Sequence, residues 1–144
     1  MRGSLHSTKI RSKPRRHKVR EFKSRIRGAD AILIATPEYN YSVPGVLKNA
    51  IDWASRPYGD NAFDGKPVGI MGASIGNLGT ARAQYHLRQS LVFLNMFPLN
   101  QPEVMIPEAH EKFDEDGKLK DEHTREKIQE LLQALVEWTR KLKR

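Results

Sequence analysis

The sequence predicts an α/β domain in which helices cover both faces of a parallel sheet. Short apolar runs of strand length alternate with longer segments whose apolar residues recur every three or four positions. This alternation is typical of a three-layer sandwich with right-handed crossovers. The chain has 144 residues, enough for one hydrophobic core, and it has no cysteine. Packing therefore holds the fold together, without disulfides or cysteine-ligated metals.

The first two elements of the domain are a helix and a strand. The helix is predicted from about residue 19, because its apolar residues recur at helical spacing. They are Val19, Phe22, Ile26 and Ala29. Residues 31–35 form a continuous apolar run, which is typical of a strand buried on both faces of a parallel sheet. Pro37 ends this strand.

The next three elements are a helix, a strand and a helix. Pro44 marks the start of the second helix, because proline is tolerated in the first turn. Its apolar stripe consists of Val46, Leu47, Ala50, Ile51 and Ala54. Residues 68–73 form the second strand and end in a glycine-rich stretch. A third helix spans about 80–94, with Leu87, Leu91 and Leu94 facing inward.

The last elements are a short strand and a long helix. Residues 104–106 form the third strand between two prolines, and 108–122 is a polar surface segment. The helix from about 122 to 142 has one apolar stripe. Its members are Ile128, Leu131, Leu132, Leu135, Trp138 or Thr139, and Leu142. In a sheet of three strands the run 31–35 lies at an edge, which favours aggregation. We therefore expect the domain to be incomplete at its N-terminus.

The positive charge is concentrated at the N-terminus. Residues 1–27 hold eleven basic side chains and one acidic one, whereas the rest hold fourteen basic and sixteen acidic ones. The net charge of +8 thus reflects a basic arm on a near-neutral body. We expect residues 1–18 to be a disordered arm and residues 19–144 to be the domain. The arm has four open interpretations: a tether for polyanions, a transit peptide, a leader foreign to the fold, or a solvated tail.

Several classes of function are not supported by the motifs. The chain has neither a GxxxxGK[ST] phosphate loop nor a GxGxxG fingerprint. Its five histidines are scattered, so no metal site is expected. Glu38 is interpreted as a turn-stabilising or solvent-facing carboxylate rather than a general base. No apolar run approaches the roughly 18 residues of a membrane span. No secretory signal is recognisable either, so we expect a cytoplasmic protein without a membrane partner.

Two loops follow the carboxyl ends of the first two strands, where doubly wound sheets bind ligands. Residues 36–45 place two tyrosines between prolines. Residues 72–79 contain glycines that let the main chain approach a flat ligand closely. Together the loops are suited to form a slot for a planar ring. The alternative is that both are only turns.

Residues 29–55, which include Thr36-Pro37-Glu38-Tyr39-Asn40, closely resemble the signature of the NADPH-dependent FMN reductase family. The strand from Lys66, the glycine-rich loop and residues 82–89 are similar to the same family, so the resemblance covers about residues 19–144. It implies a flavodoxin-like fold with noncovalently bound FMN. It also implies an oxidoreductase that passes hydride from NADPH or NADH through the flavin to quinones, dyes, metal oxyanions or free flavin. Because the cofactor supplies this chemistry, no catalytic side chain is expected.

The resemblance further implies which residues bind the cofactor. One side of the flavin ring is expected to meet Thr36, Pro37, Glu38, Tyr39 and Asn40, whose main-chain amides bond its polar edge. The other side is expected to meet Ser74, Gly76, Asn77 and Gly79. Members of the family are commonly homodimers or homotetramers. Their contacts use the helix after Ser42 and the helix that bears Arg82 and Tyr85.

The N-terminus departs from the family pattern. Family members begin with an apolar strand and a phosphate-binding loop, of which only Gly3-Ser4-Leu5 is a faint echo here. We therefore expect the first two strands and the first helix to be missing, and the chain to bind FMN poorly and to aggregate. The alternative function is a non-catalytic flavodoxin-like binding protein whose basic arm recruits nucleic acid or an acidic partner. Nucleic acid is not the partner we expect.

Overall fold

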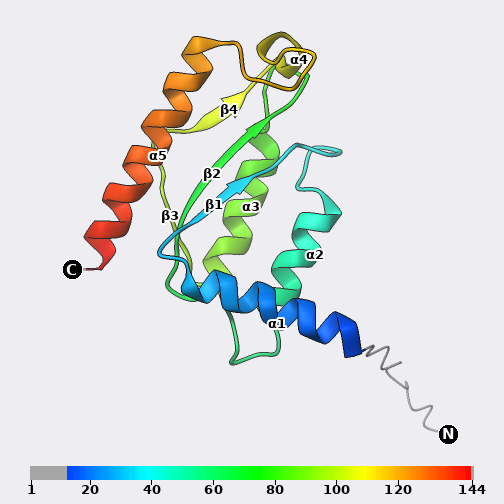
Figure 1. Cartoon of the computed structure of the whole chain (residues 1–144), viewed down its shortest axis with the longest axis vertical. Helices are drawn as coiled ribbons and strands as arrows, with labels where there is room; N and C mark the ends of the chain where they lie inside the picture. The colour runs from blue at the N-terminus through cyan, green and yellow to red at the C-terminus, as the bar shows by residue number, and fades with distance from the viewer. Residues whose placement is uncertain (1–12, 144) are drawn as a thin grey trace, which may run out of the picture.

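A computed structural model describes residues 13–143 of the chain and shows helices alternating with strands (Figure 1). In order, the elements are α1 (Lys13–Gly28), β1 (Ile32–Ala35), α2 (Gly45–Ala54), β2 (Pro67–Ala73), α3 (Ala81–Phe93), β3 (Phe97–Pro98), β4 (Val104–Ile106), α4 (Ala109–Lys112) and α5 (Glu122–Leu142). The predicted α/β class is therefore confirmed. Among these residues no helix combines the length and the apolar character needed to cross a membrane.

The sheet is parallel and has β2 at its centre. β1 pairs with β2 so that Ile32 lies opposite Val68 and Ala35 opposite Met71. On the other side of β2, its first residues pair with β3 and its last residues pair with β4. Two short strands in succession therefore occupy one edge. The strand at 104–106 was predicted, whereas β3 was missed because two residues, one of them proline, show no periodicity.

Helices cover both faces of this sheet, which confirms the three-layer prediction. In Figure 1, α5 lies on one side of the strands, and α2 and α3 lie on the other. The core under α2 and α3 includes Ile34, Ile51, Val68, Ile70, Leu87 and Leu91. The core under α5 joins Val104, Ile106 and Leu131 to the partly buried Met71 and Ala73. Alternate residues of β2 thus point into different cores.

Glycine at position 69 lets α5 pack directly on the backbone of β2. A Cβ atom at Gly69 would lie 3.1 Å from a methyl carbon of Leu135. The long helix therefore approaches the sheet more closely than a side chain at this position permits.

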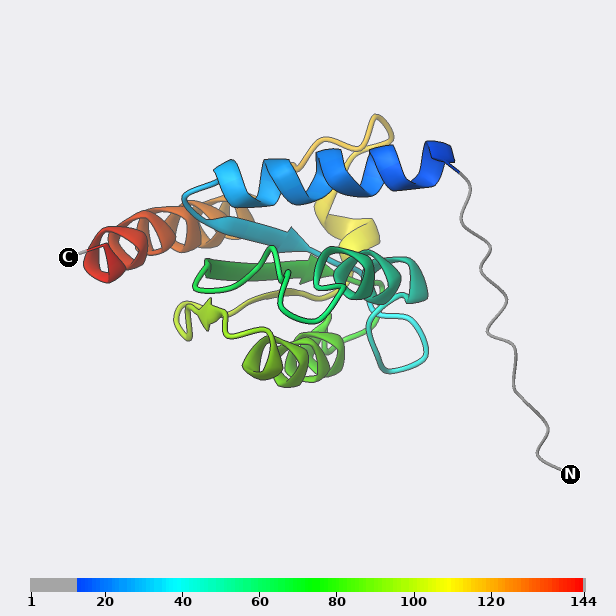
Figure 2. The same ribbon diagram turned by 90° about the horizontal axis from the view of Figure 1, so that it is seen from below.

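Helix α1 begins earlier than predicted. It starts at Lys13, so residues 13–18 are helical and do not form the disordered arm expected for residues 1–18. The rest of that expectation concerns residues 1–12, which lie outside the described part of the chain. The helix runs beside β1, at the side of the molecule away from α3 (Figure 2).

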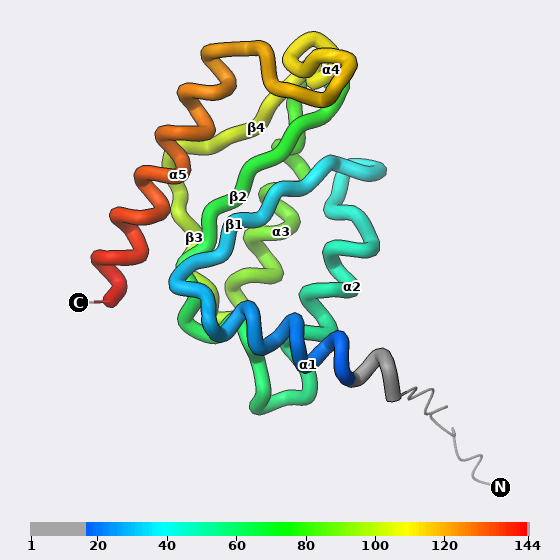
Figure 3. The backbone as a smooth tube through the Cα atoms, viewed as in Figure 1, coloured from blue at the N-terminus to red at the C-terminus, as the bar shows by residue number. Residues whose placement is uncertain are grey.

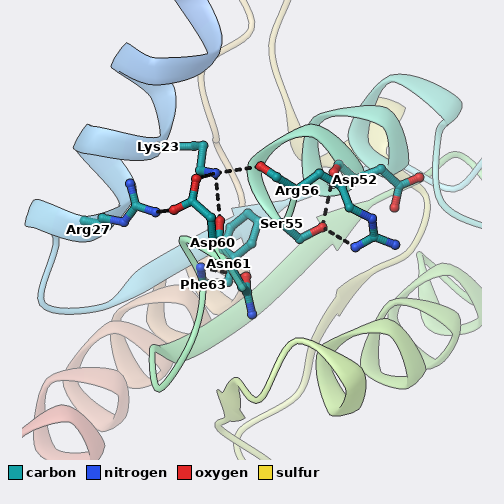
Figure 4. A network of polar contacts seen from close by, with 8 residues as sticks. All are labelled: Lys23, Arg27, Asp52, Ser55, Arg56, Asp60, Asn61 and Phe63. Atoms are coloured by element: carbon teal, nitrogen blue, oxygen red, sulfur yellow. Dashed lines mark hydrogen bonds and ion pairs between the residues drawn. The ribbon is translucent and has the colours of Figure 1, made fainter. Parts of the chain in front are cut away.

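A polar network holds α1 against the loop after α2 (Figure 4). The ammonium group of the buried Lys23 donates to the carbonyl oxygens of Arg56, at 2.6 Å, and Asp60, at 2.7 Å. It also pairs with the Asp60 carboxylate at 2.5 Å, and Arg27 pairs with the same carboxylate. The hydrogen bond from Lys23 is the main reason that the pKa of Asp60 lies below its usual value. The charged Lys23 is therefore a buried anchor of α1.

The strand β1 is the open edge of the sheet within the described residues. It pairs with β2 alone, and a hollow of about 380 Å³ lies beside it, between α1 and α2. The hollow is mainly apolar, and its lining includes Phe22, Ile26, Ile32, Ile34, Leu47 and Ile51. Leu33 of the same strand also lines the hollow and is 39% exposed. The predicted edge position of the run 31–35 is thus confirmed.

The long helix α5 begins at a charged N-cap. One carboxylate oxygen of Asp121 accepts hydrogen bonds from the amide of Thr124, at 2.8 Å, and from its hydroxyl, at 2.6 Å. The other pairs with the Lys112 ammonium at 3.0 Å. The Thr124 hydroxyl, the Lys112 ammonium and the Thr124 amide together lower the pKa of Asp121 from 3.8 to about 2.

Asp121 makes the stability of the fold pH-dependent in acid. Because its folded pKa is lowered, the ionised carboxylate contributes fully above about pH 3.8 and loses this contribution as the pH falls to about 2. Asp121→Asn keeps a capping oxygen but cannot titrate there. We expect it to destabilise the protein at neutral pH, and this deficit to shrink towards pH 2 in urea unfolding followed by circular dichroism. Glu137→Gln, on the exposed face of α5, serves as the control. A deficit that is constant with pH would contradict the prediction.

Candidate functional site

The two loops proposed to bind a ligand lie at the same end of the sheet. They leave the carboxyl ends of β1 and β2, at the upper end of the molecule in Figure 3. The amide of Thr36 donates to the carbonyl oxygen of Met71 at 3.0 Å, so β1 and β2 stay paired up to the first loop. The predicted proximity of the two loops is therefore confirmed.

Gly72 allows the close approach that brings the loops together. A Cβ atom at this position would lie 2.2 Å from the carbonyl oxygen of Thr36 and 2.4 Å from the hydroxyl oxygen of Thr80. The end of β2 is thus in contact with the start of the first loop and with the residue before α3. No side chain fits among the three.

The first loop contains a two-residue turn with an unusual backbone. Tyr39 and Ser42 exchange two main-chain hydrogen bonds of 2.9 and 3.0 Å. Between them, Asn40 has φ 49° and Tyr41 has φ 64°, so both central residues are left-handed, as in a type I′ turn. A left-handed tyrosine is strained and persists only where its surroundings hold it.

The start of α3 provides the contacts that hold this turn. The Glu38 side chain is only 5% exposed. Its carboxylate accepts hydrogen bonds from Arg82 Nε, at 2.7 Å, and from the amide of Ala83, at 3.0 Å, while Arg82 Nη2 lies 2.6 Å away. The guanidinium of Arg82 also lies over the Tyr41 ring, 3.5 Å from its centre. One turn further along α3, His86 Nδ1 is 3.0 Å from the Ser42 hydroxyl.

The environment of Glu38 keeps its carboxylate ionised. Burial by itself raises the pKa of this group, but the hydrogen bonds from Ala83 and Arg82 outweigh that effect and lower the pKa below its usual value. The contacts of its carboxylate are with the Arg82 side chain and the Ala83 amide, which attach the first loop to α3. The interpretation of Glu38 as a turn-stabilising residue, and not a general base, agrees with this geometry.

A hollow of about 280 Å³ lies against the first loop. Its lining consists of Ala35, Thr36, Pro37, Tyr39, Pro44, Val46 and Leu47. In the same turn, the main-chain amides of Asn40 and Tyr41 have no hydrogen-bond acceptor among the described residues. The turn therefore offers two unpaired amide donors, and the hollow offers an apolar surface lined by residues on both sides of the turn. Electronegative atoms and an apolar face are both features of a flat ring such as the flavin of FMN.

The second loop is tied to the end of β4 and does not line this hollow. The Ser74 hydroxyl donates to the carbonyl oxygen of Gly79 at 2.5 Å, and the Ser74 amide donates to that of Ile106 at 3.0 Å. Gly79 has φ 58°, and a Cβ atom there would lie 2.8 Å from the backbone of Met105. Gly76 and Asn77 are exposed. The flavin contacts expected of these four residues stay predictions.

The sequence predicted the two loops but not the contacts of Arg82, Ala83 and His86 with Glu38, Tyr41 and Ser42, which we call the clamp of the first loop. Arg82 was singled out only through the resemblance to the family. The contacts to Glu38 and Ser42 join positions about 44 residues apart along the chain. No local spacing reports such a contact, because it depends on how the start of α3 lies against the first loop.

Comparison with known proteins shows consistent similarities. The model of the NADPH-dependent FMN reductase family matches residues 4–111. The chain is 62% identical over 125 residues to an NAD(P)H-dependent FMN reductase of Pseudomonas aeruginosa, a match that covers 87% of this chain and 67% of the relative. It is 47% identical over 121 residues to a 2-hydroxy-1,4-benzoquinone reductase of Burkholderia sp, covering 84% and 66% of the two chains.

A solved structure is similar over the same share of the chain. The flavoenzyme NAD(P)H:(acceptor) oxidoreductase FerB from Paracoccus denitrificans superposes with a TM-score of 0.78 at 43% identity, covering 87% of this chain and 69% of that one. The chain spans about two thirds of the length of the curated relatives it matches. The family match starts at residue 4, earlier than the resemblance from about residue 19, and thus includes residues outside the described part of the chain.

Replacement of Gly72 tests the close approach at the base of the site. Gly72→Ala places a methyl group against the Thr36 carbonyl and the Thr80 side chain, and we expect it to lower the free energy of unfolding by roughly 1–3 kcal/mol. Gly76→Ala is the matched control, because the nearest atom to its added Cβ is 3.8 Å away. Urea unfolding of both variants measures the difference. Equal stabilities would show that the three segments are not in close contact.

Proposed function

The chain belongs to the NADPH-dependent FMN reductase family, and we propose that it binds FMN at the turn 36–44 and reduces quinones with electrons from NADPH or NADH. The observation that carries the proposal is that one loop combines two unpaired amides, at Asn40 and Tyr41, with residues that line an apolar hollow. The names of the relatives support a small-molecule acceptor, since one reduces FMN and another a benzoquinone. Dyes, metal oxyanions and free flavin are further acceptors of the proposed reaction.

The residues of the turn bind and orient the ring in this proposal. The amides of Asn40 and Tyr41 donate hydrogen bonds to its electronegative edge, where preorganised N–H dipoles favour added electron density. Pro37, Pro44 and Leu47 provide an apolar surface that excludes water from the ring. Bound FMN supplies the hydride-accepting and electron-donating chemistry. No side chain of the site is required as an acid, base or nucleophile.

Flavin binding and turnover test this function directly. Titration of FMN with the full chain is expected to quench the flavin fluorescence, and the complex is expected to consume NADPH when benzoquinone is added.

Tyr39→Ala removes part of the lining of the hollow and should weaken FMN binding, by about tenfold if one stacking contact is lost. Tyr58→Ala, an exposed tyrosine on a distant loop, is the control. Salt-sensitive DNA binding without any flavin quenching would instead favour the non-catalytic binding protein.

We also propose that the chain has two routes of self-association. The first route is aggregation, in which the open edge of β1 pairs with strands of other copies. The exposed Leu33 and the apolar hollow beside β1 support this route. Exposed apolar side chains on α2 and α3 support an ordered homodimer or homotetramer. They are Val46, Trp53, Tyr85, Val92 and Phe93. A cytoplasmic location stays a prediction from the sequence.

Sedimentation velocity separates the two routes. Val92→Asp places a charge on the exposed face of α3 and is expected to convert an ordered oligomer to monomer. Leu33→Lys places a charge on the edge strand and is expected to remove large, polydisperse species without changing the ordered oligomer. A wild-type chain that sediments as a single monomer at all concentrations would contradict both parts of the proposal.

A further inference from the structure

We infer that Glu38 and Arg82 are positioning residues of the flavin site, which hold the Asn40–Tyr41 turn in its left-handed form and so aim its amides at the ring. This inference rests on the proposed function, because the ring is the group that the amides would meet. Neither side chain is assigned a step of the reaction. Their role is to make the turn rigid before the ligand arrives.

The turn needs an external support. Its two central residues, Asn40 and Tyr41, both have positive φ, and neither is glycine. Such a conformation costs free energy that two main-chain hydrogen bonds between Tyr39 and Ser42 must offset. Tyr39 and Tyr41 are 61% and 65% exposed, so burial contributes little to the stability of the turn. An isolated two-residue turn of this kind is at best marginally stable.

Contacts from α3 supply that support at three points. The buried Glu38 carboxylate, directly before the turn, receives hydrogen bonds from the Arg82 side chain and from the Ala83 amide in the first turn of α3. Charge-assisted bonds of this type are stronger than neutral ones, and the N-terminus of a helix favours a negative charge. The Arg82 guanidinium covers the ring of Tyr41, and His86 contacts the hydroxyl of Ser42. Both ends and the middle of the turn are therefore attached to one rigid helix.

The same contacts couple the flavin ring to the glycine-rich loop. That loop runs directly into α3, and Gly72 and Thr80 join it to the start of the first loop. A shift of α3 therefore moves the turn, and with it the amides of Asn40 and Tyr41. In this proposal the two amides bind the ring and not the phosphate. Loss of the clamp is therefore expected to lower the affinity for FMN and the affinity for riboflavin by the same factor.

Two substitutions test the inference. Glu38→Gln keeps the shape of the side chain but removes its charge, and Arg82→Lys keeps the charge but removes the forked donor and the stacking on Tyr41. We expect each to raise the dissociation constants of FMN and riboflavin by about tenfold, measured by fluorescence quenching. Glu103→Gln is the matched control, since Glu103 accepts a hydrogen bond from Tyr85 on the same helix but does not contact the turn. Its flavin affinity should equal that of the wild type.

Hydrogen exchange of the ligand-free chain provides a readout that does not depend on flavin. The amides of Tyr39 and Ser42 are bonded to each other across the turn. In Glu38→Gln and Arg82→Lys these two amides should exchange faster, while amides in β2 keep their protection. If Glu38→Gln fails to fold, Arg82→Lys retains the bond from the Ala83 amide and serves in its place.

A rescue variant distinguishes positioning from a purely electrostatic effect. Asn40→Gly favours the left-handed backbone, so in the Glu38→Gln background it should restore part of the flavin affinity and of the exchange protection. Absence of rescue, or unchanged exchange and affinity in both single variants, would overturn the inference. A wild-type chain that binds no flavin would refute the proposed function, whereas the exchange experiment would still decide whether the clamp orders the turn.

Discussion

The site depends on how closely the end of β1, the end of β2 and the start of α3 approach one another at Gly72. There is no space for a Cβ atom between the Thr36 carbonyl and the Thr80 side chain, so these three segments are in van der Waals contact. This contact places the N-terminus of α3 next to the first loop. Glu38 then reaches the first amides of α3, and Arg82 reaches back over Tyr41. The geometry of the turn is a consequence of packing in the middle layer of the molecule.

The opposite end of the sheet is held by a different kind of contact. There, Lys23 and Arg27 of α1 share the Asp60 carboxylate. Lys66 donates to the carbonyl oxygens of Arg27 and Ala29, at and just after the end of α1. These charged contacts attach α1 to the loop after α2 but leave the edge of β1 uncovered. The domain thus has a well-packed central strand, with glycines at both close approaches, and an open apolar edge. Stability and tendency to associate originate in separate parts of the same sheet.

Most of the fold was predictable because its elements are long enough to show a period. The buried leucines of α3 and the stripe of α5 recur every three or four residues, and residues 31–35 and 68–73 are continuous apolar runs. The missed elements, β3 and α4, have two and four residues and show no period. The start of α1 was misplaced because residues 13–18 contain no large apolar side chain and therefore show no apolar period.

The sequence by itself determined the fold class, the helices and strands with clear periods, and the position of two loops at one end of the sheet. It did so because local spacing decides which faces of an element are apolar, and parallel strands end at a common edge. Only the tertiary structure decided the clamp of Glu38 by Arg82 and Ala83, the burial of Lys23, and the separation of the second loop from the hollow. Each of these depends on contacts between residues far apart in the chain, and burial and charge at such positions are properties of the packed molecule.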